Sequence, residues 1–450
     1  MWSGRLSHLV IEPAPPHAEG VGLPWDVAVD DAVAVLAAAR MEHGDTFTVR
    51  SGDDTYLFLC SPQGVTSFYG LPESDASKGV ADYLMLRRKL PDEMFVGRRT
   101  LPHELFSRDR TLRYLVDLDG ALDATIAELG PEGNVDLFAL GRRIGQRVGL
   151  ASWGGPGAAT GPRFARLAAA FEVLDGSDAF VHPDAMAAVA ASGKVAERAA
   201  LEIVVAEITE GIGMLPSTDT STDTSTDTST DTSGHPIFRS IVAAWSDQPD
   251  EVAARGVALD VALVHIASMS NLVAAIGWFL VDLLDHPELL AEVRGRGEGS
   301  RGATERAALE SIRLAQRSII SRHVLKPLSL DVGDAVYEVG RGVTIATLLP
   351  LTNVEAPGHG EFRPDRWRGR RLADVSDLGS RELVTAFGHG SHTCPAQPFS
   401  LAAMVRTAQR LFGSYDLRPG WSARPTPVPA QIGGVARVDG PCEAHYVRRC

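Results

Sequence analysis

The chain has 450 residues, and its hydrophobic fraction of 44% is ordinary for a soluble globular protein. Its 43 Lys and Arg against 57 Asp and Glu give a net charge of −14, so no nucleic-acid partner is expected. The four cysteines are far apart and form no Cys-x-x-Cys pair, which argues against a zinc site and a disulfide framework. Together with residues 1–16, which hold no apolar run typical of a signal or anchor, this predicts a cytoplasmic protein that uses no membrane.

The first predicted elements are a helix and a hairpin. A stripe of Ala, Val and Leu predicts a helix over residues 24–40. Two short β-branched and aromatic runs, 46–50 and 55–59, flank Ser51-Gly52-Asp53-Asp54 and predict an antiparallel pair of strands. Residues 71–102 hold Gly, Pro and several cations, and we expect them to form a loop.

Further helices are expected over the amphipathic patterns 103–114, 135–149, 162–174 and 187–211. After them, residues 217–233 repeat Ser-Thr-Asp-Thr and contain no apolar side chain. Ser, Thr and Asp side chains compete with the backbone for hydrogen bonds, so this tract is predicted to be a disordered surface loop between two helices. A phosphorylation tract or a tether for a partner is the alternative interpretation.

The longest helical pattern covers residues 252–284 and ends before Pro287. Its middle is unusually small and polar for a central helix. The side chains in question are His265, Ala267, Ser268, Ser270 and Asn271.

Two segments near the C-terminal third combine acidic, basic and aromatic residues. Glu310 and Arg313 lie on one face of a predicted helix, and Phe362-Arg363-Pro364-Asp365-Arg366-Trp367 follows later. Strands are expected over residues 336–349.

One cysteine, Cys394, lies in a glycine-containing loop just before an apolar helical pattern at 399–411. Gly388 and Gly390 allow the backbone to turn tightly and to approach a flat group closely. Exposed amides and the positive end of the helix favour a thiolate, which can hold a metal. The alternative is a buried cysteine that serves as a small apolar residue.

The Cys394 loop resembles the haem-binding loop of the cytochrome P450 superfamily. Phe387, Gly388, Gly390 and Cys394 match it, whereas Ala396 stands where the family has a glycine. The two other segments and the long helix occur in the family's order. The resemblance implies a mainly α, single-domain fold with small β regions over residues 1–450. It also implies haem b, bound through an axial thiolate of Cys394, in a soluble member of bacterial type.

The resemblance also implies roles for residues around the haem. The residues expected to contact haem are Phe387, Gly388, Arg322, His392 and His103, the last with Arg99 and Arg110 as alternatives for a propionate-binding cation. Those expected to form a buried ionic triad behind the cysteine loop are Glu310, Arg313 and Arg366. Those expected to contact substrate are Ala267, Ser318, Ile319, Ile320 and Ile432, and, from the 71–102 loop, Tyr83, Leu84, Leu86, Met94 and Phe95.

The long central helix departs from the family's pattern. Most members carry an acid followed by a threonine, which deliver protons during the cleavage of dioxygen. Ser270 and Asn271 stand at these positions here, as in the branch of bile-acid hydroxylases and prostacyclin synthase. Proton delivery then runs through Ser270, Ser268, His265, water or the substrate. Alternatively, Ser270 and Asn271 only bond backbone carbonyls at a helix kink.

Three functional hypotheses follow. The first is a monooxygenase that oxidises a small, largely apolar metabolite of bacterial specialised metabolism and receives electrons from a ferredoxin and its reductase. The second is redox-neutral isomerisation, dehydration or atom transfer from a pre-activated substrate without external electrons. The third is a haem protein that senses or carries a ligand without turnover.

Overall fold

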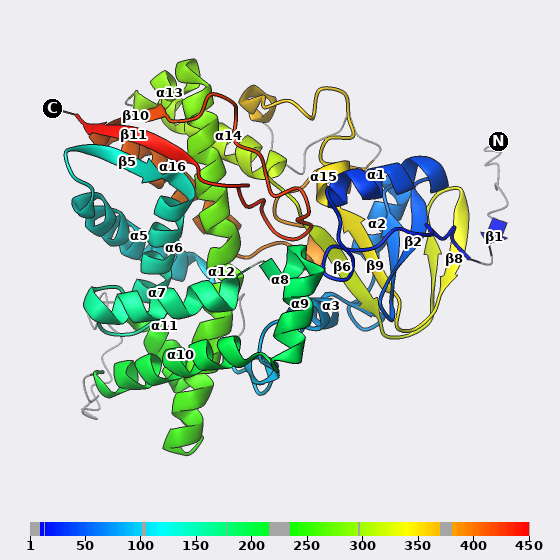
Figure 1. Ribbon diagram of the computed structural model, residues 1–450, viewed down its shortest axis with the longest axis horizontal. Coiled ribbons are helices and arrows are strands. Elements are labelled where there is room, and N and C mark those ends of the chain that lie inside the picture. The colour runs from blue at the N-terminus through cyan, green and yellow to red at the C-terminus, as the bar shows by residue number, and fades with distance from the viewer. Residues whose placement is uncertain are drawn as a thin grey trace, which may run out of the picture.

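A single long helix, α12 (Asp250–Asp285), runs through the middle of the molecule, and the other helices pack around it (Figure 1). The computed structural model describes residues 10–12, 14–100, 105–176, 178–215, 235–295, 298–369 and 380–449. Within these residues, α12 alone is long and apolar enough to cross a membrane by length and composition, and 67% of its most apolar stretch is buried inside the protein. That burial is typical of the core helix of a globular protein.

The helix α6 (Leu137–Trp153) lies directly on α12 because glycines line the face between them. A Cβ atom at Gly141 would lie 2.9 Å from the Val273 carbonyl oxygen, and one at Gly145 would lie 2.3 Å from Val273 Cγ1. The glycines therefore permit a close approach that a side chain would prevent.

The remaining helices come before and after α12 along the chain. Before α12 come α1 (Ala32–His43), α2 (Pro62–Gly70), α3 (Lys78–Leu86), η1 (Asp92–Phe95), α5 (Arg108–Glu128), α7 (Gly161–Asp175), α8 (Asp178–Val181), α9 (Pro183–Ala191), α10 (Val195–Gly213) and α11 (Pro236–Ala243). After it come α13 (Pro287–Arg294), α14 (Glu298–Leu314), α15 (Leu349–Thr352), η2 (Pro364–Trp367), η4 (Arg381–Leu383), η5 (Gly390–His392) and α16 (Gln397–Ser414).

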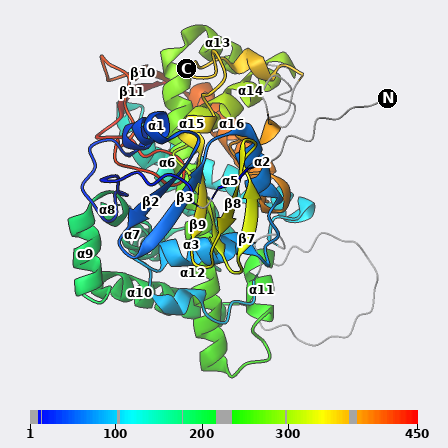
Figure 2. The same cartoon turned by 90° about the vertical axis from the view of Figure 1, so that its right-hand side faces the viewer.

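Three small sheets complete the fold. Their strands are β1 (Val10–Glu12), β2 (Thr46–Ser51), β3 (Asp54–Leu59), β4 (Ala76–Ser77), β5 (Glu132–Asp136), β6 (Ile319–Val324), β7 (Leu328–Asp331), β8 (Ala335–Val339), β9 (Thr344–Leu348), β10 (Tyr415–Pro419) and β11 (Glu443–Arg448). The largest sheet has the order β2-β3-β9-β6-β4, and Figure 2 shows β2, β3 and β9 side by side. The others have the orders β1-β8-β7 and β10-β11-β5. The mainly helical fold class with small β regions is thereby confirmed.

Several element boundaries differ from the predicted ones for local reasons. The first helix begins at Ala32 because the Asp31 side chain accepts from the first free amides. The stretch expected to be a loop contains α3, which Ser77 caps in the same way. The helix expected over 187–211 is divided into α9 and α10, because Gly193 and Lys194 adopt φ angles of 66° and 62°. The predicted loop at 217–233 lies outside the described residues.

Candidate functional site

Cys394 is held by its own loop and by the start of α16. Its amide donates to the Phe387 carbonyl at 2.7 Å and closes the loop. Gly388 has a φ of 73°, and a Cβ there would lie 2.8 Å from the His392 carbonyl oxygen, so only glycine fits. The amides of Ala396 and Gln397 bond the sulfur. Burial raises the pKa of the thiol, and these amides and Lys78 oppose that rise.

Glu310, Arg313 and Arg366 meet in one buried cluster. The carboxylate of Glu310 accepts from Arg313 Nε at 2.8 Å and from Arg366 Nε at 2.7 Å, and Glu310 and Arg313 are both fully buried. The indole of Trp367 also donates to it at 2.8 Å. Despite burial, these donors hold the pKa of Glu310 below its ordinary value, so the carboxylate stays charged.

Asn353, which the sequence did not single out, connects this cluster to the cysteine loop. Its carbonyl accepts from Arg313 Nη1 at 2.6 Å. Its side chain exchanges hydrogen bonds with Thr385, accepting from the amide and donating to the carbonyl at 2.8 Å each. An Asn in a loop carries no local sequence signal for this role.

Two cations near the loop keep unused hydrogen-bonding capacity. Arg322 is 1% exposed, donates through Nη1 to the Leu71 carbonyl, and leaves Nη2 without a hydrogen-bond partner. His392 Nε2 lies 3.0 Å from the carboxylate of Glu73, which is also 4.0 Å from Arg322 Nη2. Burial lowers the pKa of both cationic groups.

The other proposed cations lie elsewhere. Arg99 bonds Asp247 and the Ala244 carbonyl, and Arg110 donates to Ser240 at 3.3 Å. His103 lies outside the described residues.

A central cavity of about 450 Å³ adjoins the middle of α12. The five candidates outside the 71–102 stretch all line it: Ala267, Ser318, Ile319, Ile320 and Ile432. Of the candidates between 71 and 102, Leu86 lines the cavity, whereas Met94 is fully buried in the core. Apolar side chains that the sequence did not indicate complete the wall, including Trp25, Met85, Leu90 and Phe180.

The middle of α12 presents an open face. Ala267 and Asn271, one turn apart, are exposed and line the cavity, although most neighbouring residues of α12 are buried. The Asn271 side chain is already engaged, because its Oδ1 accepts from the Val435 amide at 2.8 Å. Asn271 therefore joins the helix to the C-terminal loop.

The three side chains proposed to relay protons have different surroundings. Ser270 lines the central cavity, whereas Ser268 is half-buried and is absent from the described cavity lining. His265 is 3% exposed and points into the core, where it stacks on Phe171 at 3.9 Å between ring centroids and accepts from Trp153 Nε1 at 3.2 Å. Burial lowers the pKa of His265 to about 3, so it is neutral near pH 7. The geometry thus separates His265 from the cavity.

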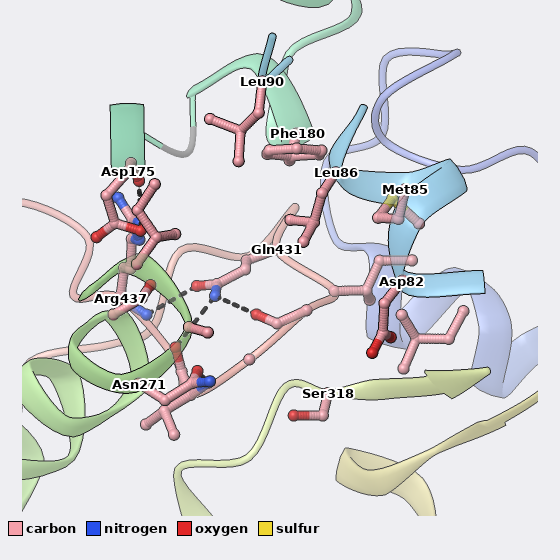
Figure 3. Close-up of a pocket in the computed structure, with 18 of the residues that line it drawn as sticks. Asp82, Met85, Leu86, Leu90, Asp175, Phe180, Asn271, Ser318, Gln431 and Arg437 are labelled. Atoms are coloured by element: carbon pink, nitrogen blue, oxygen red, sulfur yellow. Dashed lines mark hydrogen bonds and ion pairs between the residues drawn. The ribbon is translucent and has the colours of Figure 1, made fainter. Parts of the chain in front are cut away.

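A polar cluster on the cavity wall was missed by the sequence reasoning. Asp175, at the end of α7, pairs with Arg437 of the C-terminal loop at 3.7 Å, and Arg437 is fixed through its amide by Gln431 at 2.7 Å. Figure 3 shows Asp175 and Arg437 together on one side of the pocket, above Asn271, with Asp82 and Met85 opposite. The end of α7, the middle of α12 and the C-terminal loop are far apart in sequence and meet only in the folded chain.

The residues present fit a haem. The donor set offers a thiol at a helix N-terminus, a buried guanidinium nitrogen that has no hydrogen-bond partner among the described residues, and an open face of small side chains on α12. Cys394 would ligate the iron, and the Arg322 guanidinium and the His392 imidazole are the groups available for the propionates. Glu73 lies near both of these side chains, a neighbour that the sequence did not suggest.

Comparison with known proteins gives relatives first in sequence and then in structure. No protein-family model matches the chain. The human 24-hydroxycholesterol 7-alpha-hydroxylase is 26% identical over 206 residues, covering 41% of this chain and 42% of the relative. A cytochrome P450 monooxygenase of Gibberella zeae is 23% identical over 198 residues, 38% of each chain. The aligned region therefore spans only about two fifths of the length of these curated relatives.

Solved structures match over nearly the whole chain. CYP175A1 of Thermus thermophilus has a TM-score of 0.63 at 18% identity, covering 93% of this chain and 95% of that one. A 6-coordinated cytochrome P450 from another strain of Thermus thermophilus has a TM-score of 0.63 at 19% identity, covering 94% and 99%. With these relatives in sequence and fold, the chain belongs to the cytochrome P450 superfamily.

Proposed function

We propose that this chain is a haem-thiolate monooxygenase that acts on a small, largely apolar metabolite. The observation that carries the proposal is the central cavity, which has a mostly apolar wall and lies under the open face of α12. Haem, when bound, would supply dioxygen activation and the electron transfer that accompanies it. The protein contributes the thiolate, the shape of the cavity and the placement of protons.

Individual residues divide this work. Cys394 would ligate iron, and the amides of Ala396 and Gln397 steady its sulfur. The Glu310 cluster fixes the loop that carries the cysteine. Ile319, Ile320 and Ile432 exclude water and orient an apolar substrate.

The size and polarity of the cavity favour a compact apolar substrate with one polar end. The apolar side chains form most of the wall, and Asp175, Arg437 and Gln431 gather on one side of it. The human relative is named for 24-hydroxycholesterol, which is largely hydrocarbon, and we use this compound as a first probe. A role in bacterial specialised metabolism stays a prediction.

A ferredoxin is the proposed electron donor. A groove of about 640 Å³ lies between α14 and α16, the helix that begins just after Cys394, and Arg301, Arg306 and Arg406 line it with Glu305. Each arginine also pairs with a carboxylate: Arg301 with Glu305, Arg306 with Asp365 and Arg406 with Asp119. On a chain with a net charge of −14, these guanidinium groups are the proposed contacts for an acidic electron carrier. We propose a cytoplasmic location without membrane or nucleic-acid contact.

Redox-neutral or atom-transfer chemistry is the second candidate. The observation that favours it is Asn271, which replaces an alcohol and whose side-chain oxygen is bonded to Val435. In this case the cavity would bind a pre-activated substrate and external electrons would be unnecessary.

One product assay separates the two. Purified haem-loaded protein is incubated with 24-hydroxycholesterol and a panel of other small apolar compounds, with and without ferredoxin, reductase, NADPH and dioxygen. Product that requires the complete system supports the monooxygenase. Product formed without reductant supports the second candidate, and protein whose reduced, carbon-monoxide-bound spectrum lacks the thiolate signature contradicts both.

A further inference from the structure

A carboxyl group from another helix lies where α12 itself has none. Asp175 is the last residue of α7, and it lines the central cavity together with Ser270 of α12, whose hydroxyl favours the ionised form of the Asp175 carboxyl and so lowers its pKa. Lys89 holds the end of α7 in place by donating to the Leu174 carbonyl at 2.9 Å. An acid and an alcohol therefore meet at the cavity, although they are far apart in sequence.

Asp175 and Ser270 also separate two hollow spaces. Together with Ile266 they line both the central cavity and a second space of about 20 Å³, which we call the inner void. A space needs roughly 10–15 Å³ to hold one water molecule, so the inner void has room for about one. Polar side chains around it can bond such a water.

The inner void continues toward the surface. Arg142, Gln146 and Glu172 line it, and the same three residues line a groove of about 830 Å³ between α6 and α7, which we call the α6–α7 groove. Glu172 is exposed there. A series of polar groups thus joins the surface to Asp175 and, through Ser270, to the central cavity.

Burial and the neighbouring groups shift the pKa of Asp175 in opposite directions. Burial raises the pKa of its carboxyl, and this effect exceeds the opposing influence of Arg437, Ser270, Arg142 and Lys89. Asp175 therefore holds a proton at a higher pH than an ordinary aspartic acid. Its side chain is 28% exposed, and the cavity and the inner void adjoin it.

His265 also lines the inner void but is a poor proton carrier. Its Nδ1 accepts from Trp153, so its proton is on Nε2. Because burial lowers its pKa to about 3, it does not take a second proton near pH 7.

We infer that Asp175 and Ser270 form the proton-delivery pair of this enzyme, supplied from the α6–α7 groove through the inner void. The inference rests on the proposed monooxygenase function. A monooxygenation consumes the substrate, dioxygen, a pair of electrons from the reductant and a pair of protons, and it yields hydroxylated product and water. For each proton, Asp175 donates to Ser270 Oγ while the Ser270 hydroxyl gives its own proton to the oxygen that leaves as water. Water in the inner void then reprotonates the Asp175 carboxylate.

The test compares the Asp175→Asn and Ser270→Ala variants of the haem-loaded chain with wild type. Asp178→Asn is the matched control, since it makes the same change three residues on at an exposed position. The first readout is infrared absorption of protonated carboxyl groups, titrated between about pH 5 and pH 8. Because burial also raises the pKa of the Asp117 and Asp282 carboxyls, the Asp175 band is read from the wild-type minus Asp175→Asn difference spectrum. We expect this band to fade as pH rises and to be unchanged in Asp178→Asn.

The second readout uses ferredoxin, reductase, NADPH and 24-hydroxycholesterol as the probe. Proton transfer by a positioned acid contributes about 10²–10⁴-fold, so we expect Asp175→Asn to lower turnover at least tenfold. The affinity for the probe should change less than twofold, and more NADPH should be consumed per product. Turnover of wild type should fall as pH rises through the pKa of Asp175, whereas that of Asp175→Asn should not follow this profile.

Three results would overturn the inference, and a fourth would reject the proposed function instead. An Asp175 carboxyl that stays ionised over the whole titration overturns the inference whatever the assay shows. So does an Asp175→Asn protein that loses affinity for the probe but keeps its product yield per NADPH, because Asp175 is then a substrate anchor. If Asp175→Asn does not fold, a Ser270→Ala variant with wild-type turnover overturns it. A wild type that makes product without NADPH rejects the proposed function instead, and the infrared titration still shows whether Asp175 stores a proton.

Discussion

At the scale of single residues, the buried carboxylate of Glu310 is surrounded by hydrogen-bond donors. Glu310 accepts from both arginines, the Trp367 indole and the Arg363 amide at 3.0 Å or less. A buried carboxylate with so many donors is stable, but each partner becomes indispensable, since a lone buried charge is costly. The cysteine loop depends on this cluster through Asn353.

Replacing Arg313 by Ala should therefore leave Glu310 short of its main partner. We expect a loss of about 3–5 kcal/mol in the free energy of unfolding and protein that purifies without haem. Urea unfolding and the haem absorbance per protein measure the two effects. Arg363→Ala is the control, because that side chain is 64% exposed and only its backbone amide binds Glu310. Full haem content in Arg313→Ala would refute the assignment.

Asn271 offers a second prediction at this scale. Removing its side chain with Asn271→Ala would free the Val435 amide on the cavity wall. A hydrogen bond of this type contributes about 0.5–1.5 kcal/mol to the free energy of unfolding, which should fall by that amount. Because the released loop forms part of the cavity wall, binding of 24-hydroxycholesterol should also weaken. Asn271→Asp keeps an acceptor oxygen and should restore affinity. An Asn271→Ala protein that binds normally but wastes NADPH would instead point to a role in proton delivery.

At the scale of elements, the position of the cavity depends on how closely α6 approaches α12. The glycine face of α6 brings the two backbones together, and this contact sets the inner void beside Asp175 and Ser270. In an isolated helix each glycine would be unfavourable relative to alanine, so these glycines are explained by packing alone.

Gly145→Ala should consequently destabilise the protein by about 1–3 kcal/mol, because its Cβ would meet Val273 Cγ1 at 2.3 Å. Gly120→Ala is the matched control on α5, where a Cβ would meet no atom within 4 Å. That change should stabilise by about 0.5–1 kcal/mol through helix propensity. Thermal or urea unfolding measures both, and adding Val273→Ala should relieve the loss at Gly145. Equal effects of the two glycine substitutions would contradict this view of the interface.

At the scale of the whole molecule, the distribution of charge matters more than its sum. The chain is acidic, yet the groove between α14 and α16 is lined by three arginines. Electrostatic attraction of this kind mainly changes the rate of association and weakens as salt is added.

Arg301→Glu should therefore slow electron transfer from ferredoxin several-fold at low ionic strength, with a smaller difference at about 1 M salt, where the screening length falls to roughly 3 Å. The rate of haem reduction in stopped flow measures this effect. Arg301 is 75% exposed and is bonded only to Glu305 among the side chains described, so the fold should tolerate the change. Arg341→Glu, an equal change of charge in the turn between β8 and β9, should leave the rate unaltered. A loss shared by both variants would mean a general effect of net charge.

The sequence by itself determined the features that depend on neighbouring residues or on fixed spacing. Periodicity predicted α12 and the β2–β3 hairpin, and the spacing around Cys394 predicted the superfamily. The resemblance to that superfamily implied a triad of Glu310, Arg313 and Arg366, whose side chains the structure brings together. It missed α3, because its short pattern lies among Gly, Pro and basic residues.

Only the tertiary structure decided what fills the space around α12. It turned His265 into the core, bonded Asn271 to Val435, and brought Asp175 from α7 and Arg437 from the C-terminal loop to Ser270. No sequence separation encodes such meetings, because they depend on how closely helices pack and on which faces they present to each other. The residues that complete this site therefore become visible only when the chain is folded.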